Sequence, residues 1–202
     1  MDKTSKIIKL PESKCSGGIL VEEAIKSRRS VHDYTSESVT LEELSQILWA
    51  AQGITGKSRG RAAPSAGATY PLELYVVVER VTGLDPALYH YLPKEQSLEC
   101  VMLGRYSTAL SYASLGQVCV RNAALNLVFS AVYDRTTSRY GERGIRYVNI
   151  DVGHASENVY LQCRSLGLGT VAVGAFDDEK VKEALKLKTE ESPLYIMPVG
   201  RI

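Results

Sequence analysis

Residues 61–78 read RAAPSAGATYPLELYVVV, and this stretch says more about the fold than any other part of the chain. Its second half, 73–78, is dense in β-branched and aromatic residues, which predicts a central strand buried on both faces. Its first half, 61–71, is a run of small and mostly neutral residues. Such a loop either lets a flat ligand approach the backbone or simply connects a helix to the strand.

Helical patterns lie on both sides of this stretch. Upstream, one apolar face predicts a helix over 20–27, which runs into Arg28 and Arg29. A second helix begins at the capping-box pair Thr40 and Glu43 and ends at Gly53. Downstream, helical apolar spacing over 143–166 predicts a long helix that Gly167 and Gly169 terminate.

The remaining elements alternate between strands and helices. The strands are expected at 88–92, 98–103, 124–133, 170–173 and 195–199, the first two forming a hairpin, and the helices at 107–117 and 178–187. This order favours an α+β fold over a regular doubly wound one. We expect an extended N-terminal arm over 1–18, followed by a single domain over 19–202.

The charge balance excludes several function classes. The 202 residues contain 24 Lys and Arg against 23 Asp and Glu, so no overall field favours a nucleic acid or a membrane surface. The four cysteines form no C-x-x-C pair and the three histidines show no ligand spacing, so we expect no metal site and reduced thiols. No signal-peptide core follows Met1, which favours a cytoplasmic protein.

Three further segments carry groups suited to ligand binding. Residues 28–32, Arg-Arg-Ser-Val-His, combine two permanent cations, a hydroxyl and an imidazole, which suit a phosphate monoester, although basic residues are also common at solvated helix ends. Residues 171–177 contain Gly174, where the backbone could lie against an aromatic ring. Arg201, directly after the last strand, adds another cation.

Taken in order, these segments resemble the nitroreductase superfamily, and within it the SagB-type dehydrogenase domains of thiazole/oxazole-forming peptide clusters. The hallmark of that branch resembles residues 64–75, PSAGATYPLELY, and the resemblance covers nearly the whole chain. It implies a mixed, mainly antiparallel sheet flanked by helices, and a homodimer with FMN at the subunit interface.

The resemblance also implies a role for individual residues. Contacts to the FMN phosphate, ribityl chain or pyrimidine edge would come from Arg28, Arg29, Ser30 and His32, with Arg201 assisting at the phosphate. The partner subunit would supply Pro64, Ser65, Ala66 and Gly67, while Val173 and Gly174 would lie along the isoalloxazine. Many relatives carry Arg or Lys where this chain has His32, so that contact would depend on pH.

Three functions fit this picture. The first is reduction of nitroaromatics, quinones or related small molecules with NADH or NADPH, by ping-pong hydride transfer through flavin N5 and without a catalytic side chain. The second is dehydrogenation of a peptide azoline or a similar substrate together with a partner protein. The third is flavin binding or sensing without turnover.

Overall fold

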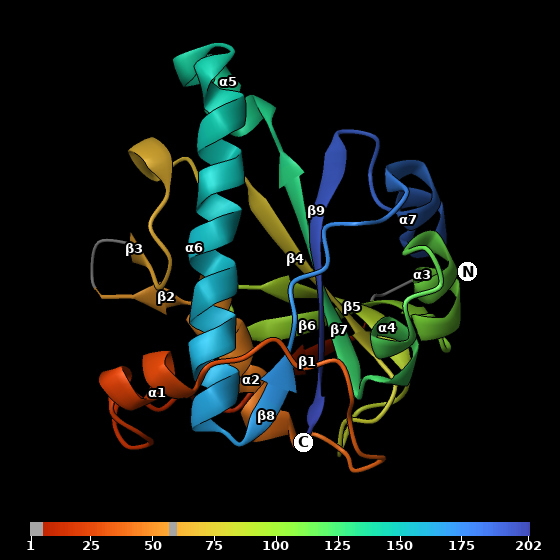
Figure 1. Cartoon of the computed structure of the whole chain (residues 1–202). Helices are drawn as coiled ribbons and strands as arrows, with labels where there is room; N and C mark the ends of the chain where they lie inside the picture. Colours follow the sequence, from red (N-terminus) through yellow and green to blue (C-terminus); the bar gives the residue numbers. More distant parts are fainter. Residues whose placement is uncertain (1–5, 57–59) are drawn as a thin grey trace.

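The computed structural model describes residues 6–56 and 60–202, which form a seven-stranded sheet flanked by helices (Figure 1). The strand order is β1-β6-β5-β4-β7-β9-β8, and all six pairings between neighbouring strands are antiparallel. The strands are β1 (Ile7–Lys9), β4 (Leu72–Val78), β5 (Ala87–Leu92), β6 (Ser97–Leu103), β7 (Leu125–Val132), β8 (Leu168–Thr170) and β9 (Glu191–Arg201). The predicted α+β class with a mainly antiparallel sheet is confirmed.

Helices cover both faces of this sheet (Figure 1). On one face lie α2 (Leu41–Gln52) and α6 (Arg143–Ser165); on the other lie α3 (Ser107–Ala113), α4 (Val118–Asn122) and α7 (Asp178–Leu185). The short helices α1 (Val21–Ser27) and α5 (Asp134–Tyr140) pack near the two ends of α6. In the described part of the chain, no helix has the length and apolar character that a membrane span requires.

The central strand β4 is buried on both faces, as its composition predicts. Leu74 and Val76 belong to the core cluster under α2 and α6, whereas Tyr75 and Val77 belong to the cluster under α3, α4 and α7. Successive side chains of a strand point to opposite faces, so a strand between two helical layers needs apolar residues at every position. β4 therefore holds the two halves of the core together.

Three predicted elements differ most from their expected bounds. The last strand, expected over 195–199, is β9 at Glu191–Arg201. The helix expected over 107–117 stops at Ala113, because Leu115 and Gly116 have φ angles of 57° and 77°, and α4 begins only after this break. The strand expected over 170–173 is β8, at Leu168–Thr170. Val173 makes only an isolated antiparallel bridge to Ile196, so the backbone beyond β8 leaves the sheet edge.

The described part of the N-terminal segment packs against the rest of its own chain. β1 pairs with the edge strand β6, and Leu10 is 3% exposed within the main core cluster. The backbone of Lys14 is tied to Gln46 of α2 by hydrogen bonds of 2.8 and 3.0 Å. Residues 1–5 lie outside the described residues, and the division into an arm and a domain remains a prediction.

A partly buried ion cluster around Glu73 of β4 gives the fold an expected pH dependence. The Glu73 carboxylate lies 2.7 Å from His90 Nε2 and pairs with Arg135. Burial by itself would raise the pKa of Glu73, but the hydrogen bond with His90 and the ion pair with Arg135 outweigh it and lower the pKa from 4.5 to about 2.

Because this pKa is depressed in the folded state, the resulting stability is fully present above pH 4.5 and is lost as the pH falls towards 2. We expect Glu73→Gln to flatten the pH dependence of the unfolding free energy in that window, as measured by urea unfolding between pH 2 and 6. Glu95→Gln, in the exposed β5–β6 turn, is the matched control. An unchanged slope in Glu73→Gln would contradict this assignment.

Candidate functional site

A cluster of uncompensated cations surrounds a cavity of about 190 Å³ between the end of α1, the C-terminal half of α6 and β8. Its lining includes Arg28, Arg29 and Arg164 together with Tyr160 and Thr170. Arg29 Nη1 donates to the carbonyls of Lys26 and Arg28, and Arg164 Nε donates to Ser27 Oγ. Within the described residues, none of these three arginines has a carboxylate partner within 4 Å. Three permanent positive charges without counter-charges favour an anion in this cavity.

The Arg28 segment is held against the sheet by Tyr160 and Thr170. The Arg28 guanidinium lies 5.1 Å from the centroid of the Tyr160 ring, and the Tyr160 hydroxyl is 3.2 Å from Ser30 Oγ. The same hydroxyl accepts the Ala172 N–H at 2.7 Å, and the Val31 N–H donates to the Thr170 carbonyl at 3.0 Å. These contacts fix residues 28–31 beside β8.

The cavity residues fit a phosphate-bearing group. Thr170 is 2% exposed, and its Oγ1 has no hydrogen-bond partner within the described residues. A buried hydroxyl that lacks a partner is costly, so a ligand oxygen here would satisfy it. A phosphate monoester requires positive charge and hydrogen-bond donors. The arginines supply the charge, and the hydroxyls of Thr170 and Ser30 can donate.

Arg201 and His32, two other residues predicted to contact FMN, do not line this cavity. Arg201 is paired across from Leu168 of β8, but its guanidinium already forms a double contact with Glu43, at 2.9 and 3.0 Å. Glu43 is also the capping-box residue of α2, so this ion pair connects the chain end to a helix start. The His32 side chain is exposed. The cofactor roles of both residues remain predictions.

The segment Val173–Gly174, predicted to lie along the flavin ring, exposes its backbone at Gly174. The Val173 N–H and C=O are bonded to Ile196 at 2.8 and 3.0 Å, whereas the following Gly174 is exposed. A Cβ added at Gly174 would meet the Tyr195 ring at 3.3 Å, so glycine keeps this backbone accessible. Gln117 Nε2 donates to the Ala175 carbonyl at 3.0 Å and supports the turn.

The small-residue loop is held rigidly by α5 and α6. The Gly67 φ angle is +60°, and an added Cβ would lie 2.4 Å from the Tyr140 hydroxyl, so a side chain there would strain the backbone and displace Tyr140. The Gly67 carbonyl accepts from Arg139 at 3.1 Å, and the Ala66 N–H points to Asp151 Oδ1 at 3.4 Å. Ser65 Oγ accepts the Tyr70 N–H at 3.0 Å, while the neighbouring Pro64 is exposed.

One chain does not bring this loop to the cationic cavity. Asp151 supports the loop and Tyr160 lines the cavity, and nine residues of α6 separate them. Nine residues are two and a half helical turns, so the two side chains point to opposite sides of α6, about 14 Å apart along its axis. Figure 1 shows the loop after β3 (Gly60–Arg61) on one side of α6 and the backbone beyond β8 on the other. Within one chain, the loop and the cavity therefore do not line a common site.

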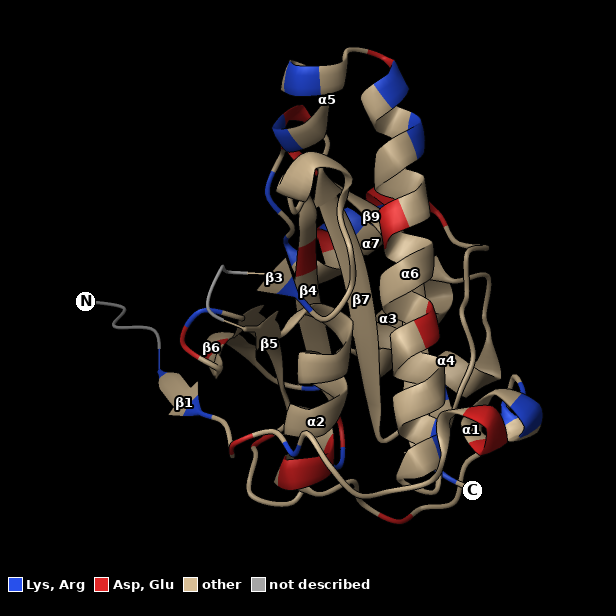
Figure 2. Ribbon diagram, turned by 90° about the vertical axis from the view of Figure 1, so that its left-hand side faces the viewer, with Lys and Arg blue, Asp and Glu red and all other residues tan. Residues whose placement is uncertain are grey.

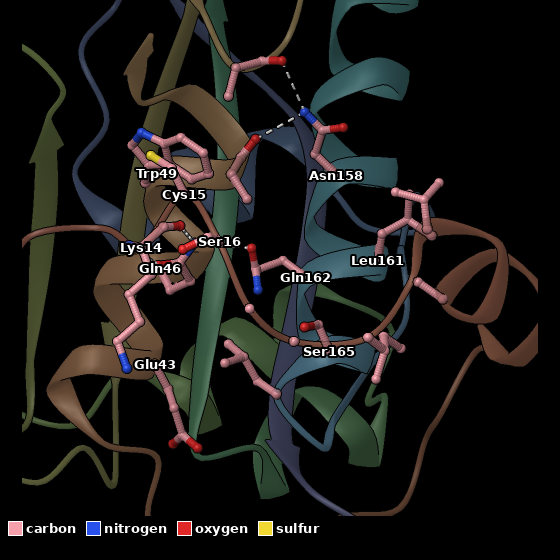
Figure 3. Close-up of a pocket in the computed structure, with 18 of the residues that line it drawn as sticks. Lys14, Cys15, Ser16, Glu43, Gln46, Trp49, Asn158, Leu161, Gln162 and Ser165 are labelled. Carbon is pink, nitrogen blue, oxygen red and sulfur yellow. Dashed lines mark hydrogen bonds between the residues drawn. The ribbon is translucent and has the colours of Figure 1, made fainter.

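A second cavity, of about 720 Å³, lies between the N-terminal segment, α1, α2 and α6 (Figure 3). The carboxamides that face it connect neighbouring elements. Gln46 is bonded to Gln162 at 3.2 Å, and Asn158 Nδ2 donates to the carbonyls of Ala50 and Ala62 at 3.0 and 3.3 Å. None of the residues predicted to contact FMN lines this cavity.

Of the residues that line the cationic cavity, sequence reasoning identified only Arg28 and Arg29, and among the polar ones it missed Tyr160, Arg164 and Thr170. Tyr160 and Arg164 are one turn apart on α6, and the periodicity of that helix identified only its apolar face. Gln117, in the short connection between α3 and α4, was also missed because a single polar residue there carries no pattern.

The chain is similar to known proteins both in sequence and in fold. The model of the nitroreductase family matches residues 25–201. The Methanocaldococcus jannaschii protein named "Putative nitroreductase MJ1384" is 48% identical over 183 residues, which cover 91% of each chain. The microcin B17-processing protein McbC of Escherichia coli is 26% identical over 150 residues, or 70% of this chain and 54% of McbC. A crystal structure titled "putative nitroreductase" from Ralstonia eutropha superposes with a TM-score of 0.86 at 28% identity, covering 100% of this chain and 91% of the other.

Proposed function

The chain belongs to the nitroreductase family, and from this premise we propose that it is an FMN-dependent oxidoreductase whose two active sites each need two copies of the chain. Its substrates are a reduced nicotinamide nucleotide and a small-molecule acceptor such as a nitroaromatic or a quinone. We place this activity in the cytoplasm, where reduced nicotinamide nucleotides are available.

The cationic cavity carries this proposal. Arg28, Arg29 and Arg164 have no carboxylate counter-charge among the described residues, and Thr170 Oγ1 has no partner there. These groups would hold the FMN phosphate, with Ser30 adding a hydroxyl at the rim. Arg201 would assist only by giving up part of its contact with Glu43.

When bound, FMN supplies the redox chemistry, because its ring accepts a hydride from the nucleotide and passes two electrons to the acceptor. The protein positions that ring. The exposed backbone of Gly174 would contact the flavin ring, and Gln117 holds the adjoining turn through Ala175. No side chain of this site is required to act as a nucleophile.

The homodimer is part of the proposal because the small-residue loop and the cationic cavity lie on opposite sides of α6. Exposed apolar side chains mark the surface that a second copy would cover: Leu20 directly before α1, Val21 and Ile25 on α1, and Ile145 and Ile150 on α6. At Gly153, one turn beyond Ile150, an added Cβ would meet no atom within 4 Å, so another helix can approach closely.

The similarity to McbC favours a second candidate function. A processing relative at 26% identity supports dehydrogenation of an azoline in a peptide, together with a partner protein. A third possibility, a flavin-binding or flavin-sensing module without turnover, would keep the same cofactor contacts. These functions differ in whether a nicotinamide nucleotide reduces the bound flavin.

The visible absorbance of the purified protein tests the proposal. We expect a yellow protein that releases FMN, identified by mass, and that is bleached anaerobically by NADPH or NADH. Flavin that stays oxidised with both nucleotides would favour the azoline dehydrogenase or the sensor. A colourless protein that cannot be reconstituted with FMN would overturn the proposal.

A further inference from the structure

A second group of uncompensated cations lies at the opposite end of α6 from the cavity. Arg139 on α5 and Arg143 and Arg146 on α6 are all exposed. Figure 2 shows Lys and Arg segments of the ribbon gathered where α5 meets α6. In the described residues, none of the three forms an ion pair, although the acidic residues Asp134 and Glu142 are neighbours in sequence.

Two of these arginines occupy helix positions that disfavour positive charge. Arg143 is the first residue of α6, Arg146 is in its first turn, and that turn contains no acidic residue. The positive end of a helix dipole repels a cation by about 0.3–1 kcal/mol. An anion bound between these side chains would reverse that repulsion, because both the guanidinium groups and the helix end attract it.

The cluster is connected to the small-residue loop by direct contacts. Arg139 donates to the Gly67 carbonyl at 3.1 Å, and the Tyr140 and Tyr147 rings meet edge-to-face at 5.2 Å, which fixes α5 against α6. In a dimer, Arg139 would therefore lie next to the loop 64–67 of its own subunit. Arg143 and Arg146 follow at the start of α6.

We propose that Arg139, Arg143 and Arg146 of one subunit bind the phosphate groups of the nicotinamide dinucleotide that reduces the flavin of the other subunit. This inference rests on the proposed function, because it uses the loop 64–67 to bring the cluster to the partner's active site. In each chain, the cavity that the proposed function assigns to the FMN phosphate lies about 27 Å along α6 from this cluster, so the two groups of arginines are separate sites.

The number and spacing of the charges favour a dinucleotide over an uncharged acceptor. Arg143 and Arg146 are three residues apart, so they are neighbours on the same helix face. Each guanidinium can bind a phosphate through two parallel hydrogen bonds. A pyrophosphate provides two such anionic groups side by side, and the 2′-phosphate of NADPH provides a third.

The test measures equilibrium binding as well as flavin reduction. Titration calorimetry on the FMN-loaded protein gives the Kd of NADP⁺ and of NAD⁺ for wild type, Arg143→Gln and Arg146→Gln. Loss of a charged hydrogen bond is expected to raise each Kd roughly tenfold in each variant. Arg121→Gln, which removes an exposed arginine on α4, is the matched control.

A hydride donor without phosphate separates this inference from the proposed function. N-benzyl-dihydronicotinamide is uncharged, so it should reduce the flavin of wild type and both arginine variants at the same rate. Unchanged Kd values in both variants would overturn the inference while leaving the flavin enzyme intact. Failure of all dihydronicotinamides to reduce the wild-type flavin would instead refute the proposed reductase.

A larger effect on NADP⁺ than on NAD⁺ would assign the cluster to the 2′-phosphate, and equal effects would assign it to the pyrophosphate.

Discussion

FMN is expected to dissociate from the Arg28→Gln variant about 10 to 100 times more readily than from wild type, because hydrogen bonds to charged groups contribute about 1.5–3 kcal/mol. The Arg28 guanidinium has no carboxylate partner among the described residues, so the phosphate would be its main counter-charge. The folded apoprotein should lose little stability, since the contact with Tyr160 contributes only about 0.5–1 kcal/mol.

Quenching of FMN fluorescence gives the affinity, and thermal unfolding of the apoprotein gives the stability. Arg121→Gln, on α4, should change neither quantity. If Arg28→Gln binds FMN with wild-type affinity, the cavity beside β8 does not hold the phosphate. Conversely, a large loss of apoprotein stability would mean that Arg28 acts mainly as a structural residue.

Replacing Ile150 by aspartate is expected to convert the dimer to a monomer and to remove FMN from the protein. Ile150 is 47% exposed on the outward face of α6, one turn before Gly153, where a second helix can approach. A carboxylate buried in an apolar interface costs several kcal/mol unless it finds a partner. Each active site would then lose the partner's loop 64–67.

Light scattering after gel filtration measures the mass, and the absorbance ratio measures the FMN content. Leu103→Asp is the control, because Leu103 is 69% exposed at the end of β6, on a different surface. An Ile150→Asp protein that remains dimeric and yellow would move the interface away from this face of α6. A monomeric wild-type protein that retains FMN would overturn the two-chain site altogether.

Local patterns in the sequence were sufficient for most of the fold. The Thr40–Glu43 capping box forms as predicted, with Glu43 N to Thr40 Oγ1 at 3.2 Å and Thr40 N to Glu43 Oε2 at 2.8 Å. The apolar run of β4 and the helical spacing of α6 were also read correctly, since residues close in sequence report the period of one element. The break at 115–116 was missed although Gly116 is a residue type that commonly ends a helix, whereas the left-handed Leu115, at φ 57°, has no sequence signature.

Local residue patterns predicted most of the elements, the family resemblance and the short motifs expected to meet the flavin. Which side chains share a site became known from the folded chain alone. It joins Arg28 to Tyr160, which is 132 positions away, and pairs Arg201 with Glu43. It also places the loop 64–67 on the far side of α6 from Arg28. The physical reason is that helix and strand patterns and helix caps depend on residues close together in the sequence. Whether a charge has a counter-charge, or a buried hydroxyl has a hydrogen-bond partner, depends on how segments distant in the sequence pack together.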